Sequence, residues 1–88
     1  MKEKELERIL KALANKRRLA ILSFLRKKKE ANVGEIAVTI HLSIKSTSRH
    51  LAVLSGVDIL DREQRSSEVF YKVNALIPDL FLPLIKSL

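Results

Sequence analysis

The fold is decided by the stretch Leu42-Ser43-Ile44-Lys45-Ser46-Thr47-Ser48-Arg49-His50-Leu51-Ala52-Val53-Leu54. Its second residue, Ser43, carries a hydroxyl that can accept a hydrogen bond from a backbone N–H three residues on. Serine is among the residues preferred immediately before a helix for this reason. The stretch therefore predicts a helix that runs from about Ile44 to Ser55.

This predicted helix has two different sides. At 100° per residue, Thr47, Leu51 and Leu54 lie within about 60° of one another, which defines a side that faces the core. Lys45 and Arg49 point the other way. A helix with this pattern presents two cations to whatever binds the outside of the domain.

Three more helices are predicted before this stretch. Residues 3–14 carry an apolar stripe at spacings of three and four, and Asn15 caps a second helix that ends near Lys28. Asn32 and Glu35 have the spacing of a capping box, which opens a short third helix. His41 lies in the turn after it, and histidine is enriched in the left-handed conformation that such a turn needs.

After Gly56 the spacing of apolar residues changes from the helical period to a period of two, which is typical of strands. Residues 59–64 and 68–73 are predicted strands joined by a turn at 65–67, which makes a β-hairpin. Residues 75–88 are predicted as a last helix, with Pro78 near its start and Pro83 producing a kink. The predicted fold is mainly α with a small hairpin, a winged helix-turn-helix of order α-α-α-α-β-β-α in one domain over 1–88.

The charge of the chain points to a polyanionic partner. Lys and Arg number 17 against 10 Asp and Glu in 88 residues, a formal charge of +7. Residues 1–30 hold 11 basic and 4 acidic side chains, whereas the two signs balance in 31–60 and in 61–88. The run Lys27-Lys28-Lys29 is open to two interpretations, a binding surface or a solvated helix end whose cations suit the helix dipole.

Several classes of protein are excluded by the same composition. The chain has no cysteine, so neither a disulfide scaffold nor a thiolate metal site is available. No apolar run is long enough to span a bilayer, and the N-terminus is charged, so we expect a cytoplasmic protein with no membrane partner. No carboxylate pair lies beside a histidine and no phosphate-binding glycine loop exists, so we expect neither an enzyme nor a cofactor.

Four segments together resemble the ArsR/SmtB family of bacterial and archaeal repressors, over about residues 9–74. They are Leu13 to Leu22, Gly34-Glu35-Ile36-Ala37, Leu42 to Leu54, and Val69-Phe70-Tyr71-Lys72-Val73. The resemblance implies a winged helix-turn-helix repressor that pairs as a homodimer through its first and last helices.

In a winged helix-turn-helix the fourth helix enters the major groove, whose width accepts one helix. Lys45 and Arg49 can then reach guanine or phosphate, and Ile44 can meet a thymine methyl group where the family commonly has a polar side chain. The hairpin tip is basic and polar, which suits phosphates or the minor groove. The predicted DNA-binding residues are Ser43, Ile44, Lys45, Ser46, Ser48, Arg49, Arg62, Arg65, Ser66 and Ser67.

Both ends of the chain carry more apolar surface than a small domain buries, so we expect a homodimer. The predicted interface residues are Leu6, Ile9, Leu10, Leu13, Leu76, Ile77, Leu80, Phe81, Leu84 and Ile85. The alternative is that both stripes belong to the core of one chain.

The resemblance also allows a metal site to be checked position by position. Asn32 and Gly34 stand where metal-sensing relatives have thiolates, and Ala75 and Ile77 stand where others have Asp and His. His41 and His50 are too few to hold a metal. We expect His50 to bond a backbone carbonyl or a phosphate, and we expect no metal site.

The leading hypothesis is a homodimeric regulator, a repressor, that reads a two-fold symmetric operator in double-stranded DNA. One alternative is an architectural DNA binder without sequence preference, which the apolar Ile44 favours. Another is a winged-helix module whose basic face binds a protein or lipid headgroups. The operator, the target gene and any small-molecule effector stay open.

Overall fold

The computed structural model describes residues 1–77 and 79–88, and its helical body is built from local signals in the sequence. Helix α1 spans Glu3–Leu13 and α2 spans Lys16–Lys28. Asn15 caps α2, because its side chain accepts from the N–H groups of Arg17 and Arg18 at 2.9 and 3.1 Å. The predicted boundaries of these two helices are confirmed to within a residue.

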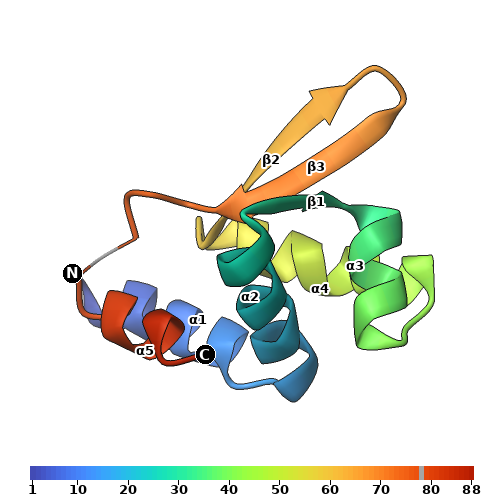
Figure 1. Ribbon diagram of the computed structural model, residues 1–88. Coiled ribbons are helices and arrows are strands. Elements are labelled where there is room, and N and C mark those ends of the chain that lie inside the picture. The colour runs from blue at the N-terminus through green and yellow to red at the C-terminus, as the bar shows by residue number, and fades with distance from the viewer. Residues whose placement is uncertain (78) are drawn as a thin grey trace.

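Helices α3 (Val33–Ile40) and α4 (Ile44–Gly56) form the helix-turn-helix unit (Figure 1). The capping box is confirmed, since Asn32 and Glu35 exchange their backbone N–H and side-chain bonds at 3.1 and 2.8 Å. His41 ends α3 with φ 57° and ψ 46°, which confirms its left-handed turn. α4 then crosses the domain and contacts α1, α2 and α3.

Three strands, and not the two predicted, make up the sheet. The hairpin of β2 (Leu60–Arg65) and β3 (Glu68–Val73) is confirmed, and its turn is shorter than predicted, at Ser66 and Ser67. A short strand β1 (Glu30–Asn32) pairs antiparallel with β3 and gives the order β1-β3-β2. Three residues are too few to show a period, so this strand gives no signal in the sequence.

The predicted last helix over 75–88 is wrong in its extent. Residues 75–76 and 79–81 form turns, and α5 spans only Leu82–Lys86. Pro83 lies in the first turn of α5, where its missing N–H costs nothing, so the expected kink does not arise. Pro78, the other proline of that prediction, lies outside the described residues.

One core joins all these elements. α2 lies at its centre and contacts each of the other four helices as well as β1 and β3 (Figure 1). The fully buried side chains among the described residues include Ile21, Leu22, Leu25, Ile36, Leu51, Leu54 and Phe81. The hairpin projects from this body as a wing. Within the described residues no helix is both long and apolar enough to cross a bilayer.

Candidate nucleic-acid interface

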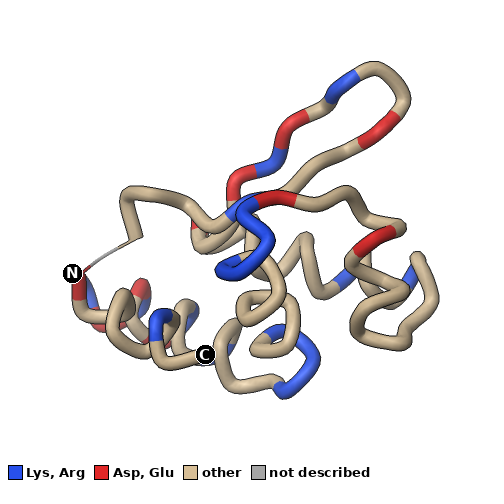
Figure 2. The backbone as a smooth tube through the Cα atoms, viewed as in Figure 1, with Lys and Arg blue, Asp and Glu red and all other residues tan. Residues whose placement is uncertain are grey.

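Helix α4 presents the face that the sequence predicts. Thr47, Leu51 and Leu54 are fully buried, so Lys45 and Arg49 on the opposite side are exposed to solvent. Along its whole length α4 carries these two cations and no acidic residue (Figure 2). A cationic helix face without a competing carboxylate is suited to a polyanion.

The first turn of α4 is shaped by Ser43. Its hydroxyl accepts from the N–H of Ser46 at 3.0 Å, so Ser43 has a structural role whether or not it also meets a phosphate. Ile44 follows with 61% of its surface exposed, and Ser48 is exposed as well. An apolar side chain this exposed at the start of the helix is available to a methyl group but offers no hydrogen bond.

A hydrogen-bond cluster that the sequence analysis missed ties α4 to the other helices. The Arg18 guanidinium donates to the carbonyls of Ala12 and Lys11 at 2.6 and 3.2 Å, and its Nη1 lies 3.2 Å from Nδ1 of His50. Among the described residues His50 bonds Arg18 and no backbone carbonyl, and its expected contact with a phosphate stays a prediction. Burial and then the charges of Arg18 and Arg17 lower the pKa of His50.

This arrangement favours the neutral form of His50. A neutral Nδ1 accepts from the Arg18 N–H, which leaves the ring proton on Nε2. Arg17 links α2 to α3, because its Nη1 donates to the carbonyl of Ile40 at the end of α3 at 3.3 Å. No sequence pattern could have shown this cluster, since Arg18 and His50 are 32 positions apart.

In the wing, one of the predicted DNA-binding cations is paired with carboxylates. Arg65 forms ion pairs with Glu63 of the same strand and with Glu30 of β1, and its guanidinium lies 4.5 Å from the centroid of the Phe70 ring. These hydrogen bonds to the two carboxylates raise the pKa of Arg65 and lower that of Glu30. Arg65 therefore links the wing to β1, and its predicted contact with DNA would compete with these ion pairs.

The rest of the wing remains open to a ligand. Arg62, Ser66 and Ser67 are exposed, and Ser66 makes the turn with φ 55°. Figure 2 shows both signs of charge alternating along β2, in contrast to α4. The wing is thus a weaker electrostatic surface than the helix beside it.

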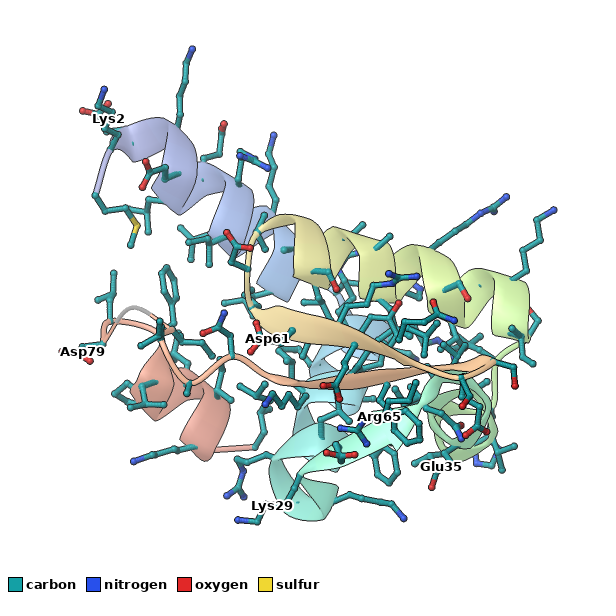
Figure 3. All side chains as sticks on the ribbon, turned by 90° about the horizontal axis from the view of Figure 1, so that it is seen from above. Lys2, Lys29, Glu35, Asp61, Arg65 and Asp79 are labelled. Atoms are coloured by element: carbon teal, nitrogen blue, oxygen red, sulfur yellow. The ribbon has the colours of Figure 1, made fainter. Side chains whose placement is uncertain are left out.

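The predicted interface residues divide into two groups. Leu13, Ile77, Phe81 and Ile85 are buried in the core of one chain, and Leu6 and Ile9 pack against that core. The exposed members are Leu10, Leu76, Leu80 and Leu84, at 47, 88, 63 and 56%. Figures 1 and 3 place α1 and α5 at the same end of the molecule, away from α3.

The positions checked for a metal have other roles here. Asn32 caps α3, and Ile77 belongs to the core. Within 1–77 and 79–88, no three His, Asp or Glu side chains gather as metal ligands would.

This geometry can be compared with known proteins. A model of the family described as "Bacterial regulatory protein, arsR family" matches residues 15–62, more than half of the chain. The chain belongs to the ArsR family. The matched residues run from the cap of α2 through α4 to the middle of β2, so the match covers the whole helix-turn-helix unit.

Two curated ArsR-type relatives are transcriptional regulators. HlyU of Vibrio cholerae, named a transcriptional activator, is 37% identical over 67 residues, which cover 76% of this chain and 61% of HlyU. PagR of Bacillus anthracis, named a transcriptional repressor, is 33% identical over 66 residues, 75% of this chain and 66% of PagR. The chain thus spans less than two thirds of either relative, and its family is one of regulators and not of enzymes.

Solved structures agree with the fold. HlyU from V. cholerae superposes with a TM-score of 0.81 at 30% identity, over 99% of this chain and 92% of that one. Mb0332 from Mycobacterium bovis, described as a homodimeric winged helix-turn-helix DNA-binding domain, superposes with a TM-score of 0.83 at 25% identity, over 96% and 77%. The ArsR-type winged helix-turn-helix is therefore the fold of this chain.

Proposed function

We propose that this ArsR-family chain is a homodimeric transcriptional repressor that acts as one DNA-binding domain in the cytoplasm. The observation that carries the proposal is the exposed face of α4, which holds Lys45 and Arg49 and no acidic side chain. A repressor that blocks the transcription machinery sterically needs only to bind its operator. The DNA contacts of this small domain are sufficient for that.

In this proposal each α4 enters a major groove. Lys45 and Arg49 bind guanine edges or phosphates, and Ile44 packs on a thymine methyl group. The start of α4 supports a phosphate near Ser43, because free N–H groups collect at a helix N-terminus. Ser46 and Ser48 flank this face, while Arg62, Ser66 and Ser67 of the wing meet the adjoining backbone.

The dimer is proposed to form through the exposed leucines Leu10, Leu76, Leu80 and Leu84. Apolar side chains this exposed at one end of a small domain favour a partner, and Mb0332 is described as homodimeric. A two-fold pair of α4 helices would sit about 34–36 Å apart, which corresponds to half-sites about 10 base pairs apart or a multiple of that.

Selection of bound fragments from a random DNA pool tests this function. Enrichment of an inverted repeat with that half-site spacing would support a sequence-specific dimer. Retention of DNA without any enriched sequence would instead support the architectural binder that the apolar Ile44 favours. Failure to retain DNA at low salt would refute both. Transcription in vitro from a promoter that overlaps the selected site then distinguishes repression from activation.

A further inference from the structure

A groove of about 370 Å³ lies between the C-terminal end of α2, the end of β3, and α5. Its floor is apolar and consists of Leu25, Val73, Leu82 and Ile85. Its rim is charged and carries Arg26, Lys29, Lys72 and Lys86, together with a single acid, Glu30. The groove therefore combines an apolar floor with an excess of positive charge.

The spacing of the residues explains why they meet. Arg26 lies in the last turn of α2 and Lys29 follows the helix directly as its C-cap, so both cations lie at the same end of α2. Lys86 lies one turn after Leu82 on α5, so a cation and an apolar side chain stand together there as well. Contacts of α2 with both β3 and α5 bring the three sets into one groove.

The four cations have no partner within residues 1–77 and 79–88. None of them makes an ion pair or a side-chain hydrogen bond there, whereas both carboxylate oxygens of Glu30 bind Arg65. Asp61, which lies opposite Lys72 in the sheet, accepts from the side chain of Asn74 at 2.8 Å. Lys72 lies between Glu30 and Asp61 in the sheet, so its charge is partly offset. Arg26, Lys29 and Lys86 have no acid paired with them among the described residues, so the rim keeps an excess of positive charge.

Lys29 is also held in a costly conformation. Its φ of 84° and ψ of −52° are strained for any residue with a side chain, and glycine would adopt them at lower cost. The chain therefore places a long cation at the rim where a glycine would be more stable. A lysine at this strained position favours a functional role for its charge.

We propose that this groove binds a small amphipathic anion, specifically a carboxylate on a short aliphatic chain. The chain would lie on Leu25, Leu82 and Ile85, and the carboxylate would be held by the cations of the rim. A groove of this volume is at the lower end of the range, about 300–1,000 Å³, of small-molecule sites.

The groove is separate from the proposed DNA surface. In Figure 3 the strands β2 and β3 run between α4 on one side and Lys29 on the other. Its apolar floor also offers nothing to a phosphodiester backbone. Binding of the carboxylate therefore does not depend on the proposed repressor function, and it can succeed or fail independently of any DNA measurement.

Calorimetric titration of the full chain with octanoate tests the proposal, with octanol and octylammonium as probes of equal chain length. Octanoate should bind and the other two should bind far more weakly. The double variant Arg26→Gln/Lys86→Gln should bind octanoate about threefold to tenfold more weakly. Lys4→Gln/Lys16→Gln, which removes the same charge from exposed positions outside the groove, should bind it like the wild type.

A second variant separates the site from a folding effect. Lys29→Gly should weaken octanoate binding while raising the melting temperature by about 4–8 °C, because it relieves strain and removes a cation at once. Equal binding of octanol and octanoate would overturn the proposal, as would equal losses in the groove variant and its control. Binding to anionic lipid vesicles without binding of free octanoate would also overturn it, in favour of a membrane surface.

Discussion

Thr47 provides a test in which a conservative substitution should make the protein more stable. It lies on the core side of α4 with none of its surface exposed, and its hydroxyl oxygen has no hydrogen-bond partner within residues 1–77 and 79–88. Replacement by valine keeps the shape and the branched Cβ while it removes the unpaired hydroxyl. Threonine and valine have similar helix propensities, so the helix itself should not change.

The expected gain follows from the burial. A buried polar group without a partner costs about 1–3 kcal/mol. We therefore expect Thr47→Val to raise the free energy of unfolding by about 1 kcal/mol or more, which corresponds to about 4–8 °C in melting temperature per kcal/mol. Urea denaturation followed by circular dichroism, at one fixed protein concentration, measures this gain.

Thr47→Ser is the matched control. It keeps the hydroxyl and deletes a buried methyl group, so it should lower the free energy of unfolding by about 1 kcal/mol. DNA affinity should be unchanged in Thr47→Val, because the side chain faces the core of the domain and not the face of α4 that is proposed to enter the major groove. A loss of stability in Thr47→Val would show that the hydroxyl has a partner and would refute the reasoning.

Three further predictions concern pH, metals and assembly. The pKa of His50 is lowered in the folded state, so the unfolded chain takes up the proton first and stability is lost as pH falls below the ordinary value of 6.5. His50→Gln should flatten the decline in unfolding free energy between about pH 7 and 5, and a profile parallel to wild type would contradict the lowered pKa of His50. Zinc, cadmium, nickel and arsenite at stoichiometric levels should leave DNA affinity unchanged, and tight metal uptake with release of DNA would disprove this. Leu80→Glu places a charge on the exposed apolar end, so sedimentation should show folded monomers and the salt dependence of DNA binding should be roughly halved. A Leu80→Glu protein that stays dimeric would remove Leu80 from the interface.

The elements that could be predicted from the sequence depend on local chemistry. The caps at Asn15, Asn32 and Ser43 each bond a backbone N–H within three residues, so the capping residue and its partner appear in the same short stretch of sequence. The left-handed turn at His41 and the buried face of α4 follow from residue type and helical spacing in the same way. These signals were sufficient for the helix-turn-helix unit and for the cationic face of α4.

What could not be predicted depends on residues far apart in the chain. β1 exists because Ala31 pairs with Tyr71 of β3, and Arg65 reaches back 35 positions to Glu30. The apolar run near the C-terminus was predicted as one long helix, but Phe81 and Ile85 enter the core through turns and a short α5. Apolar content alone does not tell whether a side chain faces its own core or a second copy.

The central claim is that the exposed face of α4 reads DNA, and titration of Lys45→Ala and Arg49→Ala against the selected DNA site tests it most directly. Both side chains are exposed, so circular dichroism should show folded variants, and each should bind about 1–3 kcal/mol more weakly than wild type. Lys4→Ala, which removes an exposed cation of α1 at the end of the molecule away from α3, should bind nearly like wild type. If Lys45→Ala and Arg49→Ala both bind the site with wild-type affinity, α4 is not the reading helix and the account is wrong.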